Sequence, residues 1–191
     1  MSKKLLSLFS GCGGMDLGFE GDFDVLAQSI NLDINPGFIK FLTADNNWVR
    51  LKKTSFDTAF ANDIEKAAKI CWEDYFNRKQ DKIGVFHLGS IVDLVKNSQE
   101  KKSFNENFEG VDIVTGGFPC QDFSVSGKRN GFMSHKSHTG KLLSERDEPN
   151  LENRGKLYAW MRDVVEIVKP KMFIAENVKG LMTLQDAVDV I

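Results

Sequence analysis

Short apolar runs along the chain alternate with longer stretches whose apolar residues recur every three to four positions. Five of the runs have the length and composition of buried strands, at residues 5–9, 56–61, 85–88, 111–115 and 172–176. The spacing predicts helices from about residue 15, over 64–76 and over 157–168, and Pro170 ends the last of them. Strands that alternate with helices in this way predict an α/β fold, in which helices cover both faces of a mostly parallel sheet.

Two polar segments do not fit this alternation and are interpreted as insertions, at about 22–55 and about 133–153. The second consists mostly of charged and small residues. The stretch 96–107, with its Lys, Asn, Ser and Glu residues, is interpreted as a solvated connector. The first insertion has enough apolar surface to pack on something, contributed by Phe38, Ile39, Phe41, Leu42 and Trp48.

The composition of the chain limits its function classes. Its 191 residues, 41% of them hydrophobic, are enough for one soluble domain with a sizeable core. The formal net charge of -2 gives no basic signature, so any contact with nucleic acid is local or supplied by another part. Three widely spaced cysteines, without a hydrophobic leader, indicate a reducing compartment and therefore the cytoplasm. No apolar run approaches the roughly 18 to 20 residues that cross a bilayer, so we expect no membrane insertion.

Unusual clusters of residues follow the ends of four predicted strands. They are Ser-Gly-Cys-Gly-Gly at 10–14, Asn-Asp at 62–63, Gly-Gly-Phe-Pro-Cys-Gln at 116–121 and Glu-Asn-Val at 176–178. In an open parallel sheet, ligands bind in the crevice at the carboxyl ends of the strands, where such loops converge. The sequence therefore predicts a binding site formed by these four clusters.

The glycines of the first cluster allow the backbone to approach a ligand closely, and the following helix offers free N–H groups. A plain tight turn between strand and helix is the alternative. The dinucleotide fingerprint has a glycine where this chain has Asp16, which disfavours an enzyme that uses a nicotinamide cofactor. The Asp63 carboxylate is placed either to accept hydrogen bonds from the two hydroxyls of a ribose or to cap the next helix.

A thiol and a carboxyl group stand at two of the strand ends. Pro119 fixes the direction in which Cys120 leaves the sheet, and a helix N-terminus or the nearby Lys128 and Arg129 favour its thiolate. Glu176 ends an apolar strand, where desolvation favours the protonated form that can donate a proton. A buried structural cysteine and a salt-bridged surface glutamate are the alternatives. Together the two groups suit the addition of a nucleophile to an electron-poor ring.

Four motifs stand in order along nearly the whole chain. They are Phe9-Ser10-Gly11-Cys12-Gly13-Gly14, Gly117-Phe118-Pro119-Cys120-Gln121, Arg154-Gly155-Lys156-Leu157 and Glu176-Asn177-Val178. Their residues, order and spacing resemble those of the cytosine-5 DNA methyltransferase family. The resemblance implies a Rossmann-like fold that binds S-adenosylmethionine, double-stranded DNA as substrate, and a role as a restriction-modification methylase.

The resemblance also implies a mechanism. The target cytosine is flipped out of the duplex, Cys120 adds to ring carbon 6, and Glu176 holds and protonates ring nitrogen 3. Carbon 5 then takes the methyl group from S-adenosylmethionine, and loss of the carbon-5 proton with expulsion of the thiol restores the ring.

The same resemblance assigns the binding residues, and no metal site is expected. The cofactor is expected to contact Phe9, Ser10, Gly11, Cys12, Gly13, Gly14, Met15, Asp63, Ile64, Ser90, Ile91, Pro119 and Leu157. The flipped base and DNA are expected to contact Phe118, Gln121, Ser124, Ser126, Lys128, Arg129, Asn177 and Val178.

The chain departs from the family pattern at two places. Many relatives carry an acidic residue that contacts the adenine amino group where this chain has Ser90, and Asp93 is the alternative partner. The loop behind the nucleophile is lengthened after Met133. Its section 128–141 is interpreted as a stripe that contacts phosphates, or as a solvated loop, and holds Lys128, Arg129, His135, Lys136, His138 and Lys141.

The family pattern continues beyond Glu-Asn-Val with further strands, an arginine motif, a target-recognition domain and a closing helix. Residues 1–191 are therefore interpreted as a partial catalytic domain without target recognition, either a truncated piece or one subunit of a split enzyme. Alone, it is expected to bind the cofactor weakly and to methylate nothing. The alternatives are a silent cofactor-binding or partner-binding module, a tRNA cytosine-5 methyltransferase and, more distantly, a dinucleotide oxidoreductase.

Overall fold

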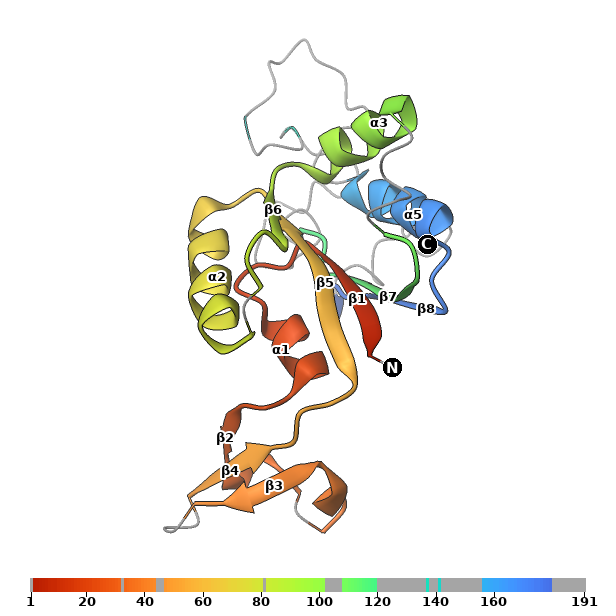
Figure 1. Ribbon diagram of the computed structural model, residues 1–191. Coiled ribbons are helices and arrows are strands. Elements are labelled where there is room, and N and C mark those ends of the chain that lie inside the picture. Colours follow the sequence, from red (N-terminus) through yellow and green to blue (C-terminus); the bar gives the residue numbers. More distant parts are fainter. Residues whose placement is uncertain are drawn as a thin grey trace.

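The centre of the protein is a five-stranded parallel sheet. The computed structural model describes residues 2–31, 33–43, 47–80, 82–101, 108–119, 137, 141 and 156–179. The strand order is β6-β5-β1-β7-β8, and every neighbouring pair runs parallel (Figure 1). The strands are β1 (Lys3–Leu8), β5 (Phe56–Asp63), β6 (Phe86–Leu88), β7 (Val111–Gly116) and β8 (Met172–Ala175). The α/β fold and the five strands predicted from apolar runs are confirmed, with strand ends shifted by at most two residues.

Helices cover both faces of this sheet, as predicted. Figure 1 shows α1 (Gly14–Glu20) and α2 (Lys66–Gln80) on one side, and α3 (Ile91–Lys101) and α5 (Leu157–Val168) on the other. On the α2 side, the core contains Ala61, Trp72, Phe76 and Phe86. On the α3 and α5 side, it contains Leu6, Leu8, Val92, Val95, Val114, Met161 and Val164, among others. None of the helices in the described part of the chain is long and apolar enough to cross a membrane.

The interpretation of residues 96–107 as a solvated connector is wrong for the first six of them. Helix α3 runs to Lys101, and residues 102–107 lie outside the described residues. Its apolar residues Ile91, Val92 and Val95 are buried in the core, whereas Lys96 and Asn97 are exposed. The helix was missed because its apolar positions are confined to its first five residues, so the polar remainder has no helical pattern of its own.

The insertion at 22–55 folds into a separate three-stranded antiparallel sheet, in the order β2-β4-β3. Its strands are β2 (Asp24–Leu26), β3 (Ile39–Leu42) and β4 (Trp48–Leu51), with short 3-10 helices at Ala27–Ser29 and Pro36–Phe38. Figure 1 shows this sheet apart from the central one, beyond the amino end of β5. Its side chains Phe38, Phe41, Leu42 and Trp48 are exposed, and Val49 is the fully buried residue of the three strands, so the expectation that this apolar surface packs on something stays a prediction.

The two ends of this insertion are joined to each other. Gly21 pairs with Lys53, and the backbone N–H of Thr54 donates to the carbonyl oxygen of Glu20 at 2.9 Å. Gly21 has a φ of 70°, and a Cβ there would lie 2.2 Å from the carbonyl oxygen of Lys52, so a side chain does not fit. The insertion therefore leaves and re-enters the body of the protein at one point.

A buried ion pair holds the amino end of the sheet together. The ammonium group of Lys82 donates to Glu20 Oε1 at 2.6 Å and to Asp57 Oδ1 at 2.9 Å. Glu20 is fully buried and Lys82 is nearly so. The Thr58 N–H donates to the same Glu20 oxygen at 2.8 Å, so this cluster ties α1 to β5 and to the residues before β6.

Candidate active site at the carboxyl edge of the sheet

The turn after β1 is bonded to the end of β5. The Ser10 N–H donates to the carbonyl oxygen of Asn62 at 2.9 Å, and the Gly11 N–H donates to Asp63 Oδ2 at 2.9 Å. The side-chain amide of Asn62 donates in turn to the carbonyl oxygen of Gly89, at 2.8 Å. The first two predicted clusters and the start of α3 thus lie together at one edge of the sheet.

The three glycines of this turn have different surroundings. A Cβ at Gly13 would lie 2.6 Å from Trp72 and 2.7 Å from Phe76, so this glycine allows the turn to pack on α2. Open space surrounds the Cβ positions of Gly11 and Gly14. Phe9, Gly11 and Gly13 have φ values of 54°, 55° and 86°, so the backbone is in the left-handed region even at a phenylalanine. A non-glycine residue there is strained, and such strain is typical of functional sites.

Asp63 and Ser90 both hold the first turns of helices. Asp63 Oδ1 accepts a hydrogen bond from the Glu65 N–H at 3.0 Å, just before α2, while its other oxygen accepts from Gly11. Ser90 Oγ accepts a hydrogen bond from the Val92 N–H at 3.2 Å, in the first turn of α3. Ser90 is buried, whereas Asp93, the alternative contact for an adenine, is exposed one turn further on. Met15 lies half-buried in the first turn of α1, and Cys12 and Ile64 are exposed at this edge.

The ends of β7 and β8 are joined by hydrogen bonds. The Glu176 N–H donates to the carbonyl oxygen of Gly116 at 2.9 Å, and the Asn177 side-chain amide donates to the carbonyl oxygen of Phe118 at 3.0 Å. A Cβ at Gly117 would lie 3.2 Å from Glu176 Oε2, so the carboxyl group lies against the glycine. The side-chain oxygen Oδ1 of Asn177 accepts a hydrogen bond from the Val178 N–H at 2.8 Å. The Gly-Phe-Pro and Glu-Asn-Val motifs therefore lie side by side.

Three predicted contact residues are parts of the core. Phe118 is buried, with its ring centroid 6.3 Å from that of Tyr158 on α5, and Leu157 is buried in the same cluster. Ile91 also belongs to this cluster. Pro119 is half-buried and is the last described residue before the predicted nucleophile.

Several predicted residues lie outside the described residues. They are Cys120, Gln121, Ser124, Ser126, Lys128 and Arg129, together with most of the 133–153 insertion. Of the predicted phosphate-contacting stripe, Lys141 is described, and its carbonyl oxygen accepts a hydrogen bond from the Ser137 N–H at 2.9 Å.

The surroundings of Glu176 differ from the sequence-based expectation. We expected a desolvated carboxyl group at the rim of the sheet, but Glu176 is exposed. The strand that carries it is exposed too: Met172, Phe173 and Ile174 retain 55%, 58% and 37% of their accessible surface. Among the described residues β8 is the last strand of the sheet, and the apolar residues that predicted a buried strand are exposed.

Sequence reasoning missed a buried carboxyl group behind the glycine turn. Asp16 has no exposed surface, and its Oδ2 accepts hydrogen bonds from the Trp72 indole N–H at 2.7 Å and the Ser10 hydroxyl at 3.0 Å. Burial raises the pKa of Asp16, against the opposing effect of these donors. Asp16 Oδ1 has no hydrogen-bond partner among the residues that the structure describes. In the sequence, Asp16 was noted only because it stands where the dinucleotide fingerprint has a glycine.

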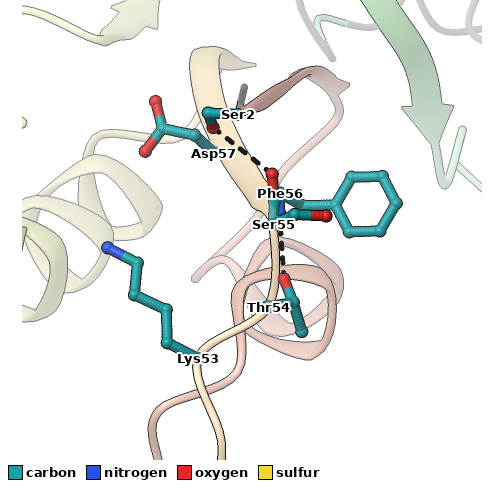
Figure 2. Close-up of a pocket in the computed structure, with 6 residues that line it drawn as sticks. All are labelled: Ser2, Lys53, Thr54, Ser55, Phe56 and Asp57. Carbon is teal, nitrogen blue, oxygen red and sulfur yellow. Dashed lines mark hydrogen bonds between the residues drawn. The ribbon is translucent and has the colours of Figure 1, made fainter.

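A shallow hollow of about 450 Å³ lies at the opposite end of β5 from Asp63. Figure 2 shows its lining of mostly polar residues, in which the Ser2 hydroxyl donates to the carbonyl oxygen of Ser55 at 3.3 Å. The remaining lining residues are Lys53, Thr54, Phe56 and Asp57. Because it opens at the amino ends of the strands, this hollow is not part of the candidate site.

Comparisons with known proteins agree with the motifs at this edge. The family model of the C-5 cytosine-specific DNA methylase matches residues 3–190. Type II methyltransferase M.BsuRI of Bacillus subtilis is 30% identical over 183 residues, which are 94% of this chain and 33% of the relative. M.NgoFVII of Neisseria gonorrhoeae is 31% identical over 94% of this chain and 31% of its own length. M.BspRI of Lysinibacillus sphaericus is 33% identical over 94% of this chain and 34% of its own length. The chain thus spans about a third of the length of these relatives.

Proposed function

Because the chain belongs to the C-5 cytosine-specific DNA methylase family, we propose that it supplies the cofactor site and the catalytic groups of an enzyme that methylates carbon 5 of cytosine in DNA. The observation that carries this proposal is the pairing of Gly-Phe-Pro with Glu-Asn-Val on neighbouring strand ends, at the edge where the glycine turn also lies. The type II methyltransferase relatives support a restriction-modification role for this enzyme. Its double-stranded DNA substrate and its cytoplasmic location are proposed from the sequence motifs and the cysteine content.

The residues of the glycine turn fit S-adenosylmethionine. Open space at Gly11 and Gly14 leaves room for a ligand against the backbone, and the strained Phe9 is held at the end of β1. We assign the methionine end of the cofactor to residues 9–15, and its ribose to the free lone pairs of Asp63 with Ile64 beside them. Ser90, Ile91, Pro119 and Leu157 border the remaining cofactor space in this proposal. When bound, S-adenosylmethionine supplies an electrophilic methyl group.

The chain's own groups perform the additions and proton transfers on cytosine. The Cys120 thiolate forms a bond to carbon 6, and Glu176 donates a proton to nitrogen 3, so the electron pair is placed on carbon 5. After methylation of carbon 5, its proton is removed by a base, the bond from sulfur to carbon 6 breaks, and nitrogen 3 returns its proton. Asn177 supports this role of Glu176, since it ties the glutamate's strand end to Phe118, two residues before the thiol.

A second, complementary part is the partner we propose for this chain. The uncovered apolar residues of β8 lie on the open edge next to Glu176, and a protein part that covers them would also desolvate the carboxyl group. That part, in the same polypeptide or in another subunit, is proposed to carry target recognition, with DNA contacts from Gln121, Ser124, Ser126, Lys128, Arg129 and Val178 on this side. The exposed edge also favours the second candidate function, a cofactor-binding module that is silent when alone.

Calorimetry and a methylation assay test the proposal. The isolated chain is expected to bind S-adenosylmethionine and S-adenosylhomocysteine but not NAD, and binding of NAD alone would overturn the cofactor assignment. With a target-recognition part supplied, we expect radioactive methyl groups to enter duplex DNA in preference to tRNA. Cys120→Ser is expected to abolish the incorporation, and Cys71→Ser, which changes an exposed thiol of α2, to leave it unchanged. Undiminished incorporation with Cys120→Ser contradicts the nucleophile, and a preference for tRNA contradicts the substrate.

A further inference from the structure

The buried carboxyl group of Asp16 connects the two sides of the glycine turn. The Ser10 hydroxyl, at the start of the turn, shares a 2.7 Å hydrogen bond with Ser7 and donates to Asp16. The Trp72 ring, which donates to the same carboxyl oxygen, also fills the space at Gly13. We propose that Asp16 is a positioning residue, which as a carboxylate holds this turn in the shape that binds S-adenosylmethionine. This inference rests on the cofactor assignment made above.

The hydrogen bonds around Asp16 suit its ionised form. Oδ2 accepts from two donors, and hydrogen bonds to a charged acceptor are shorter and stronger than those between neutral groups. A proton on Oδ2 would compete with these donors, so the protonated carboxyl group would bind them less well. The bonds to Ser10 and Trp72 are therefore charge-assisted, and strongest, while the carboxyl group is ionised.

The charges around Asp16 oppose its ionisation. Three neutral groups face Asp16. They are the hydroxyl of Ser7 on β1, the hydroxyl of Ser10 in the turn and the indole of Trp72 on α2. The charged group that acts on Asp16 is Glu20, one turn further along α1, and its negative charge disfavours a second one nearby. Lys82 lies against Glu20, where it forms the buried ion pair described above. Burial without a cation of its own raises the pKa of Asp16.

Fold stability consequently favours the protonated form of Asp16, whereas cofactor binding favours its ionised form. In the folded protein the pKa of Asp16 lies above its unfolded value, so the folded state binds the extra proton more tightly. The contribution of Asp16 to stability is therefore greatest at low pH and is lost as the pH rises from the unfolded pKa to the folded one. Cofactor affinity changes in the other direction, because the carboxylate that binds Ser10 and Trp72 forms only as the pH rises.

Asp16→Asn separates a positioning role from a structural one. The amide has nearly the same size and retains an acceptor for Trp72, but it carries no charge. At neutral pH we expect the variant to melt at or above the temperature of the unchanged protein, and to bind S-adenosylmethionine roughly tenfold more weakly, the effect of losing one charge-assisted hydrogen bond. Asp112→Asn is the matched control, because Asp112 lies at the opposite edge and pairs with Lys171; its affinity is expected to be unchanged.

Two pH measurements complete the test. The affinity of the unchanged protein for S-adenosylmethionine is expected to fall as the pH is lowered. The affinity of Asp16→Asn is expected to depend less on pH. The indole N–H signal of Trp72 in a nitrogen–proton NMR spectrum is expected to shift over the same pH range, and to lose this shift in Asp16→Asn. Ser10→Ala is also expected to weaken the binding of S-adenosylmethionine. The double variant Ser10→Ala with Asp16→Asn is expected to bind no more weakly than Asp16→Asn alone.

The outcomes distinguish this inference from the cofactor assignment. If the unchanged chain fails to bind S-adenosylmethionine, the cofactor assignment is wrong, whatever Asp16 does. If the unchanged chain binds and Asp16→Asn binds equally well, Asp16 is not a positioning residue. If melting temperature and affinity both fall in Asp16→Asn and the Trp72 signal does not titrate, the residue is merely structural and the proposal is overturned.

Discussion

Asn177 Nδ2 donates a hydrogen bond to the carbonyl oxygen of Phe118 at 3.0 Å, across 59 positions of the sequence. This bond continues the pairing of β7 and β8 beyond their last ladder bond, from the Glu176 N–H to the Gly116 carbonyl oxygen. The loop that leads to Cys120 is thereby held against the residue that follows Glu176. The backbone of Phe118 is thus tied to the strand end of Glu176 by a side chain to which we assign no part in the chemistry.

We expect Asn177→Ala to lower stability modestly and activity strongly. Loss of one partly buried hydrogen bond costs about 1 kcal/mol, or about 2–4 °C in melting temperature for a chain of this size. Methylation, measured with a target-recognition part present, is expected to fall by more than this loss of stability explains. The control is Asn97→Ala, at an exposed position of α3, which is expected to change neither quantity. Equal activity in both variants contradicts the positioning role of Asn177.

Two neighbouring glycines are expected to respond differently to the same substitution. Gly13→Ala forces a methyl group to within 2.6 Å of Trp72 at a φ of 86°, and we expect it to destabilise the protein by about 3 kcal/mol or more. Gly14→Ala adds a methyl group in open space at the first residue of α1, where alanine favours the helix by up to about 1 kcal/mol. Urea unfolding measures both, and a similar midpoint for the two variants contradicts the packing of Gly13 on α2.

Lys82→Met is expected to be among the most destabilising single substitutions outside the site. It leaves the charge of Glu20 buried without its ammonium partner, and the loss of one member of a buried pair costs about 3–5 kcal/mol. The double variant with Glu20→Gln is expected to recover much of this loss. Arg162→Gln, which removes an exposed pair on α5, serves as the control and costs less than about 1 kcal/mol. Unfolding free energies from denaturant titration decide the comparison.

Lowering the pH is expected to reduce the stability of the folded protein, partly through protonation of Asp112. A hydrogen bond from Lys171 and another from the Lys4 backbone hold the pKa of Asp112 below its ordinary value. A carboxyl group with a lowered folded pKa contributes stability above its unfolded pKa, near 3.8, and that contribution is lost as the pH falls through the folded pKa. Melting temperatures from pH 7 down to about pH 3 are expected to fall less steeply in Asp112→Asn. A curve parallel to that of the unchanged protein contradicts this contribution.

Phe173→Glu tests whether the open edge of β8 receives a complementary part. The Phe173 side chain is 58% exposed, so the isolated chain is expected to unfold within about 0.5 kcal/mol of its original stability. Reconstituted methylation is expected to fall, because a charge on this edge opposes apolar docking. The same substitution at Ile83, exposed before β6 at the other end of the sheet, is the control and is expected to leave reconstitution unchanged. Full reconstitution by Phe173→Glu contradicts docking on β8.

The sequence predicted the central sheet well because its strands are short, largely apolar runs between turn residues, and those of β1 and β7 are mostly buried. The four clusters of the site were found for a related reason: glycine, proline, thiol and carboxyl groups gather at strand ends, where side chains are not needed for packing. The roles of the individual residues in them stay predictions. Cys120 lies outside the described residues, so its geometry stays untested too.

The parts that sequence reasoning missed depend on contacts between distant residues. Asp16 and Trp72 are 56 positions apart, and no local pattern indicates that they share a hydrogen bond. The exposure of Glu176 reflects the uncovered edge of β8, whereas its apolar neighbours predicted a buried strand. In the 22–55 insertion, the pairing of three short strands with one another joins residues that no local pattern links, and it leaves most of the apolar side chains exposed.

The joined ends of the 22–55 insertion separate its fold from the strand order of the central sheet. Because Gly21 pairs with Lys53 and Thr54 bonds to Glu20, the chain returns to the point from which it departed, and the entry of β5 into the sheet does not depend on what lies between. The length of the segment between these joined ends therefore does not determine the order of the five parallel strands. The same junction is a natural place at which to graft a foreign domain, since the graft would lie at the far end of β5 from the cofactor turn.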